Sequence, residues 1–120
     1  MPASPTGNVL SGSVDRLPII VVATATPGTL IHTAYNGVAG FDGLWIFASN
    51  VTGTAATLTV EWGSVTDPGG LLVKAYSVPA NSAPIPIALG QRMNNTKVVR
   101  AFSGTASAIN ITGWYNRMFL

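Results

Sequence analysis

Eight short segments rich in Val, Ile, Thr and aromatic residues recur along the chain, each bounded by Gly, Pro, Asn or Asp. They cover residues 17–26, 28–35, 43–50, 56–63, 71–78, 84–89, 97–103 and 108–116. No segment repeats apolar residues at helical spacing, which disfavours a parallel βαβ architecture. The sequence therefore predicts an all-β fold: an antiparallel β-sandwich of about eight strands, with a jelly roll as the expected variety. Pro86 lacks an amide donor and predicts that the sixth strand lies at a sheet edge.

The third segment is apolar on both faces. Successive side chains alternate across a strand, so Leu44, Ile46 and Ala48 share one face. Trp45 and Phe47 share the other. Residues 17–22 are likewise apolar on both faces. Such strands need cover on both sides, which the sandwich core supplies on one side and an arm, a loop or a neighbouring subunit supplies on the other.

The fourth segment is typical of a half-buried strand. Leu58, Val60 and Trp62 point one way, whereas Thr57, Thr59 and Glu61 point the other way. Glu61 is therefore expected on the outer strand surface, away from its neighbour Trp62. This separation disfavours a catalytic or sugar-binding role for the pair.

Charged residues are scarce. The chain has six Lys and Arg and four Asp and Glu among 120 residues, or 8%, against about 25% in ordinary soluble domains. A monomer of this mass exposes on the order of 6,000 Å² of surface, so its charges are thinly spread. We expect much of the exterior to meet other protein, most simply in a homo-oligomer such as a trimer. A monomer with a neutral, hydroxyl-rich exterior is the alternative.

The first 16 residues differ in composition from the rest. They hold two prolines, two glycines and four hydroxyl residues, too little apolar content for a core. We expect an extended arm over residues 1–16 and a single sandwich domain over residues 17–120. Val9, Leu10 and Val14 would anchor the arm on a neighbour, unless it is a functionless tail. The apolar C-terminus, with Trp114, Tyr115 and Phe119, is expected in a core or an interface.

Catalytic groups are sparse and scattered. His32 lies in an apparent strand with no carboxylate close in sequence, and is expected to be a polar strand residue. Asp42 and Asp67 lie in the turn-like contexts GFDG and TDPGG. Asp15 and Glu61 have no acidic neighbour, and there is no cysteine. The sequence therefore predicts no enzyme, no catalytic or metal-binding residues, no cofactor and no small-molecule substrate.

Nucleic-acid and membrane partners are also disfavoured. The six basic residues never form a run, whereas nucleic-acid binding calls for a basic stripe. The N-terminus lacks a signal-like apolar run, and no segment approaches the ~20 apolar residues of a membrane helix. We expect a soluble protein made in the cytoplasm.

The order of strand-like and turn-like stretches in residues 40–118 is similar to that of a known class of viral proteins. The stretches LWIFASNVTGTAATLTVEWG, DPGG, SVPANSAPIPI and KVVRAFSGTASAINITGWYNR follow one another in this region. This pattern resembles small virion proteins of tailed bacteriophages, of the head decoration or capsid cement type. The N-terminal third departs from the pattern, so the resemblance leaves the mode of attachment open.

The resemblance implies a β-sandwich that forms trimers on the phage head and stabilises it by binding the major capsid protein from outside. The protein would then be made in the host cytoplasm and reside in the virion. Partner contacts are expected from Trp45 and Phe47 in addition to the arm and the C-terminal residues. A carbohydrate- or receptor-binding module of a phage fibre is the alternative, with aromatic residues as a stacking platform. Its candidates are Trp45, Trp62, Tyr76, Trp114 and Tyr115.

Overall fold

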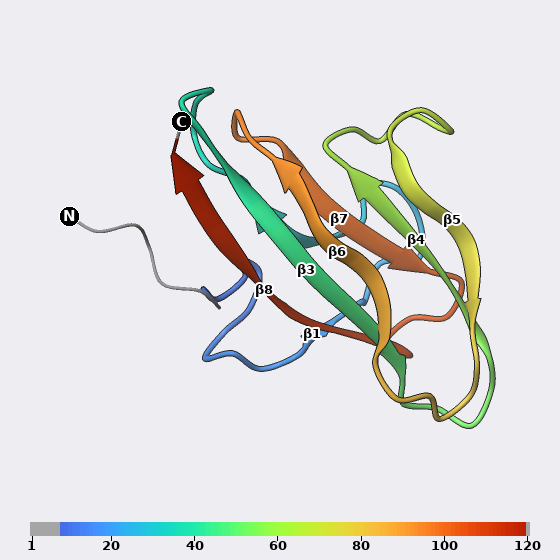
Figure 1. The fold of residues 1–120 in the computed structure, drawn as a ribbon. Coiled ribbons are helices and arrows are strands. Elements are labelled where there is room, and N and C mark those ends of the chain that lie inside the picture. The colour runs from blue at the N-terminus through green and yellow to red at the C-terminus, as the bar shows by residue number, and fades with distance from the viewer. Residues whose placement is uncertain (1–7, 120) are drawn as a thin grey trace.

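The computed structural model describes residues 8–119 and consists of eight strands in two four-stranded antiparallel sheets (Figure 1). The strands are β1 (Ile19–Ile20), β2 (Thr29–Thr33), β3 (Gly40–Asn50), β4 (Ala56–Trp62), β5 (Leu71–Val78), β6 (Ile85–Met93), β7 (Val98–Ser103) and β8 (Ile109–Phe119). No helix occurs within this range, and hence none that could cross a membrane. The predicted all-β sandwich of eight strands is confirmed.

Each sheet mixes strands from both halves of the chain. Sheet A has the order β1-β8-β3-β6, and sheet B has the order β2-β7-β4-β5. In Figure 1, β8, β3 and β6 of sheet A lie in front of β7 and β4 of sheet B. The longest pairing joins β3 to β8, in unbroken register from Gly40 opposite Phe119 to Asn50 opposite Ile109. This ladder joins the two central strands of sheet A.

The core lies between the inward faces of the two sheets. Leu44, Ile46 and Ala48 of β3 are buried, as their alternation predicts. Leu58 and Val60 of β4 meet them from sheet B. The inward assignment of both segments is confirmed.

Two strand boundaries differ from the sequence prediction. The first segment was expected to be a strand over residues 17–26, but only Ile19–Ile20 pairs with β8. The chain then leaves sheet A, because the amides of Val22 and Ala23 donate to Thr29 Oγ1 at the start of β2. The third strand begins at Gly40, three residues before the predicted start, and so includes Asp42.

Strand β6 is an irregular edge, as Pro86 predicts. Its register with β3 shifts twice, between Leu44 and Trp45 and between Ile46 and Phe47. Gly90 has a φ of 83°, a conformation that L side chains rarely adopt. Bulges of this kind bend an edge strand and interrupt its ladder.

Gly113 permits the close approach of β8 to β3. It has a φ of 149°, and a Cβ atom there would lie 1.9 Å from the carbonyl oxygen of Trp45. No side chain fits at this distance, so glycine is required opposite Ile46, its partner in the register.

Residues 8–12 of the predicted arm, which we call the N-terminal segment, pack on their own sandwich. Asn8 and Tyr115 exchange two backbone hydrogen bonds of 3.0 Å. Leu10 is only 2% exposed and belongs to the core, so its predicted role as an anchor on a neighbour is not what this structure shows. Residues 1–7 of the predicted arm lie outside the described range.

Candidate functional site

Large apolar side chains gather on the outward face of sheet A. The register pairs Trp45 of β3 with Trp114 of β8 and with Leu89 of β6. Outward positions recur every second residue along β3, which adds Phe41 and Phe47. Met118 lies opposite Phe41. We call these six residues the aromatic face: Phe41, Trp45, Phe47, Leu89, Trp114 and Met118.

Three of these rings form a stack across two strands. The ring centroids of Trp45 and Trp114 are 5.8 Å apart, with 11° between their planes. Phe47 and Trp114 are also 5.8 Å apart, at 28°. Cross-strand aromatic pairs of this kind stabilise a sheet, by roughly 0.2–1 kcal/mol relative to alanine pairs. The stack fixes the shape of the face before any partner binds.

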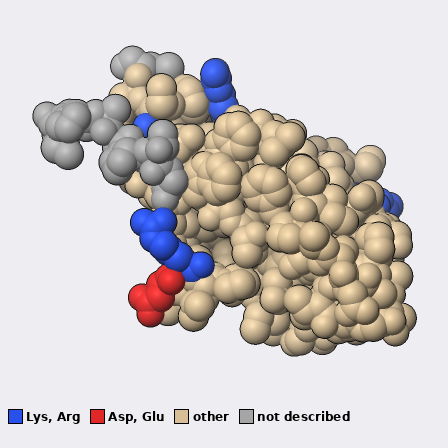
Figure 2. Space-filling model, turned by 60° about the horizontal axis from the view of Figure 1, so that its bottom comes forward, with Lys and Arg blue, Asp and Glu red and all other residues tan. Residues whose placement is uncertain are grey.

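The aromatic face carries little charge. Among the outward positions that the register assigns to sheet A, the charged residue is Arg92, opposite Gly43. Its guanidinium lies 4.5 Å from the centroid of the Phe41 ring, a cation–π contact. In the view of Figure 2, charged side chains occur only near the margins of the molecule. Low charge with enriched aromatic residues is typical of the centre of a protein interface.

The other predicted partner contacts do not join this face. Tyr115 lies one residue from Trp114 and so points to the opposite side of the sheet, where its ring is 4.4 Å from His32. Phe119 is exposed and meets the ring of Tyr35 edge-on at 5.5 Å. Val9 is half-buried, and Val14 is 70% exposed in the turn after the N-terminal segment. The structure thus unites Trp45, Phe47 and Trp114 and separates the rest.

The five aromatic residues proposed for sugar stacking do not form one platform either. Trp62 belongs to sheet B and packs against the core, while Tyr115 points inward. Tyr76 is exposed on β5, in sheet B. Only Trp45 and Trp114 share a surface.

A buried polar network at one end of the core links both sheets. Asp42 of β3 accepts hydrogen bonds from His32 Nε2 at 2.7 Å and from Arg117 Nε at 2.7 Å and Nη2 at 3.0 Å. The backbone amide of Tyr35 also donates to Asp42, at 3.1 Å. The expectation that Asp42 is a turn residue is wrong, since it is a buried strand residue with a bidentate arginine partner. His32 is a polar strand residue of β2, as expected, and it is buried beside this carboxylate.

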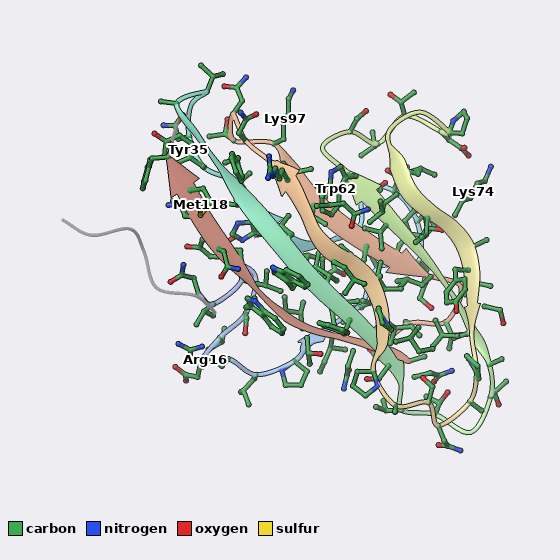
Figure 3. The ribbon with its side chains drawn as sticks, viewed as in Figure 1. Arg16, Tyr35, Trp62, Lys74, Lys97 and Met118 are labelled. Carbon is green, nitrogen blue, oxygen red and sulfur yellow. The ribbon has the colours of Figure 1, made fainter. Side chains whose placement is uncertain are left out.

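The charge states of the network follow from these contacts. Burial lowers the pKa of His32 below its ordinary value and outweighs the opposing effect of Asp42. Burial alone would raise the pKa of Asp42, but the hydrogen bonds and charges of Arg117 and His32 together lower it. The hydrogen bond to Asp42 is the main cause of a raised pKa at Arg117. At neutral pH the network is therefore a neutral histidine beside an Asp–Arg ion pair. Figure 3 shows Tyr35 and Met118 near one another at this end of the sandwich.

Ser11, His32 and Asp42 are linked in series, as in a Ser–His–Asp triad. The hydrogen bonds of Ser11 nevertheless indicate a structural role rather than a nucleophile. His32 Nδ1 accepts the backbone amide of Ser11 at 3.0 Å, and Ser11 Oγ lies 3.1 Å away. Because Nε2 donates to Asp42, the lone pair of Nδ1 is the base that would have to take the serine proton, and the amide already occupies it. The hydroxyl in turn accepts the amide of Thr33 at 2.6 Å. These bonds fasten the N-terminal segment to β2.

Glu61 is buried, which contradicts its predicted place on an exposed strand face. Its outward direction is consistent with the register, since it lies opposite Arg100 of β7. The loop before β2 covers it: the amide of Gly28 donates to Oε1 at 2.7 Å, and the Thr26 hydroxyl bonds Oε2. Arg100 Nη1 donates to the Gly28 carbonyl at 3.3 Å and so holds the same loop. Asp67, by contrast, lies in the predicted turn and pairs with exposed Lys74 at 2.8 Å.

Sequence reasoning missed the His32–Asp42–Arg117 network because its members are far apart in the chain. The available signal was a histidine directly after the apolar pair Leu30 and Ile31, since a histidine needs a polar partner when buried. Within residues 8–119, no group of three His, Asp or Glu side chains is placed to hold a metal ion. No family model, curated protein or solved structure matches this chain.

Proposed function

We propose that this protein is a capsid decoration protein of a tailed bacteriophage, which binds the major capsid protein on the outer surface of the assembled head and stabilises it. The observation that carries the proposal is the aromatic face: a preformed, nearly uncharged patch on the outside of sheet A. The resemblance of residues 40–118 to head decoration proteins supplies the identity of the partner. The protein would be made in the host cytoplasm and act in the virion, with no enzymatic step.

The strand order supports a jelly-roll version of the sandwich. Four pairings join strands whose numbers sum to nine: β1 with β8, β2 with β7, β3 with β6 and β4 with β5. This order results when a long antiparallel ribbon is folded over on itself, which gives two Greek keys in two sheets. Jelly rolls occur in viral shells among other proteins, so the topology agrees with the proposed role without requiring it.

The mechanism of stabilisation is linked equilibrium. A protein that binds only the assembled shell stabilises it by mass action. A trimer that contacts several capsomers at once gains effective concentration at each further contact, so each individual contact can be weak. An apolar patch suits this task, because it buries area without requiring many matched charges.

The runner-up function, carbohydrate binding, is supported by Trp45 and Trp114 alone. A sugar ring stacks on the face of an aromatic ring. Trp114, however, stacks against both Trp45 and Phe47, and these contacts use the ring faces that a sugar needs. The geometry therefore favours a protein partner over a glycan.

The test is binding to undecorated heads of the phage that encodes this chain. Leu89 is 59% exposed beside Trp45, so Leu89→Lys adds a charge to the aromatic face without altering the core. Val65, 51% exposed in the loop after β4, provides the matched control Val65→Lys. Co-sedimentation should show the unaltered chain and Val65→Lys bound at equal occupancy, with Leu89→Lys weakened at least tenfold. Equal binding by all three proteins, or no binding by any, contradicts the proposal. Binding to a glycan array that Trp114→Ala abolishes would favour the runner-up.

A further inference from the structure

The N-terminal segment, residues 8–12, is held to the sandwich by a compact set of contacts. Asn8 pairs with Tyr115 through two backbone hydrogen bonds, and Leu10 fills a place in the core. The amide of Gly12 donates to the Ile31 carbonyl at 2.9 Å. Ser11 contacts His32 and Thr33 as described above. All of these partners lie on β2 or β8, so the segment docks as one unit.

This segment protects the edge of sheet B. Strand β2 is the last strand of its sheet, so alternate backbone groups point away from β7. Gly12 satisfies the carbonyl of Ile31, and the Ser11 hydroxyl satisfies the amide of Thr33. Without the segment, β2 would present unpaired groups to any other strand.

The turn that connects the segment to β1 is conformationally unfavourable. The amide of Leu17 donates to the Val14 carbonyl at 2.9 Å, which closes a four-residue turn. Its two central residues, Asp15 and Arg16, have φ values of 54° and 63°. Two positive φ values define a type I′ turn, which favours Asn-Gly at these positions and disfavours a long side chain such as arginine. Opening the turn would release this strain. Figure 3 shows Arg16 at the margin of the molecule.

Apolar groups around this turn are exposed within the described residues 8–119. Val14 and Leu17 are 70% and 61% exposed. With Ile20 and Leu30 they line an open groove of about 530 Å³ between the turn and β2. A cavity of about 40 Å³ also remains under the docked segment, beside Val9 and Ile111. A second chain that passes this point would cover the groove.

We propose that residues 8–12 exchange between copies of this chain, so that each segment docks on β2 and β8 of a neighbouring copy. The exchanged segment makes the same hydrogen bonds and fills the same Leu10 site, so among the contacts described above the exchange gives up only the Leu17–Val14 hydrogen bond that closes the turn. It relaxes the turn at Asp15 and Arg16 and buries Val14 and Leu17 between the two copies. A short strained hinge is the feature that invites such exchange. This inference does not rest on the proposed function.

The decisive variants are opposite substitutions at one hinge position. Asp15→Gly accepts a positive φ without strain and should favour the closed single chain. Asp15→Pro fixes φ near about −65°, which is incompatible with the closed turn, and should favour exchange. Sedimentation at matched concentration should show an oligomer fraction at least tenfold higher for Asp15→Pro than for Asp15→Gly. Equal oligomer fractions for the two folded proteins overturn the proposal.

A disulfide trap tests the exchange directly and does not need the proline variant. Asn8 and Tyr115 form a hydrogen-bonded antiparallel pair, whose Cα atoms are about 5.5 Å apart, within the range that a disulfide spans. The chain has no cysteine, so Asn8→Cys/Tyr115→Cys contains only the engineered pair. After oxidation, exchange gives covalently linked chains on a non-reducing gel, in a proportion that rises with the protein concentration before oxidation. Single internally bridged chains at every concentration up to about 1 mM overturn the proposal. Circular dichroism of the reduced variant checks that it is folded.

Discussion

His32 and Asp42 belong to different sheets, yet the imidazole Nε2 lies 2.7 Å from the carboxylate Oδ2, and both side chains are buried. The bond joins β2 of sheet B to β3 of sheet A through the core. The other imidazole nitrogen, Nδ1, accepts a hydrogen bond from the amide of Ser11, and Asp42 forms an ion pair with Arg117. The stability of the sandwich is therefore coupled to the protonation of one histidine.

We expect the free energy of unfolding to fall as the pH decreases below about 6.5. The folded pKa of His32 lies below its ordinary value of 6.5, so the unfolded chain binds more protons between these two values. Asp42 adds a second loss below its ordinary value of 3.8, because its folded pKa is also lowered. Urea titrations from pH 7.5 to 3 should show both steps. His32→Gln should flatten the first step and keep the second; an unchanged first step in this variant would contradict the assignment.

Arg117→Met should destabilise the fold by about 3 kcal/mol, because it leaves the buried carboxylate of Asp42 without its cation. The double variant Asp42→Asn/Arg117→Met should recover part of this loss, since no charge remains buried there. Lys74→Met is the control: its pair with Asp67 is exposed, so the change should be within about 0.5 kcal/mol. Urea denaturation midpoints at pH 7 measure all three. Similar losses for Arg117→Met and Lys74→Met would show that the buried pair has no special role.

Glu61→Gln should cost about 1–3 kcal/mol of stability, the range for a buried donor that loses its acceptor. The carboxylate accepts from both Gly28 and Thr26, whereas an amide offers only one oxygen. Hydrogen exchange should report faster exchange of the Gly28 amide. Thr105→Val, at an exposed position outside this loop, should change neither quantity. A protected Gly28 amide in Glu61→Gln would count against this account of the loop.

Gly113→Ala should destabilise the protein by more than about 3 kcal/mol, or prevent folding, because the added Cβ meets the Trp45 carbonyl at 1.9 Å. Gly53→Ala is the matched control, since a Cβ there has no atom within 4 Å. Thermal unfolding followed by circular dichroism distinguishes the two. A melting temperature of Gly113→Ala within a few degrees of the control would refute the required close approach.

The local pattern of the sequence was sufficient to predict the strands. Segments rich in Val, Ile, Thr and aromatic residues between turn residues indicated all eight, although the first strand is only two residues long, and Pro86 indicated the β6 edge. Alternation identified Leu44 and Ile46 as core residues. The same pattern assigned Glu61 to the surface, because alternation gives the direction of a side chain but not what covers it. The loop at Thr26 and Gly28 provides that cover. Gly28 lies 33 residues before Glu61 in the sequence, so the local pattern does not reveal the contact. Asp42 was misassigned because its neighbouring glycines resemble a turn, although they lie within β3.

The irregular edge of β6 limits how copies of this protein can add to one another. A sheet lengthens sideways when an edge strand offers an unbroken row of amides and carbonyls, and repetition of that step builds a fibril. Pro86 removes one amide from β6, and its two register shifts and the left-handed Gly90 interrupt the row. Strand β1, at the other edge of sheet A, pairs over only two residues. Sheet A therefore resists open-ended growth at both margins, so the addition of copies along this sheet should not build amyloid-like filaments.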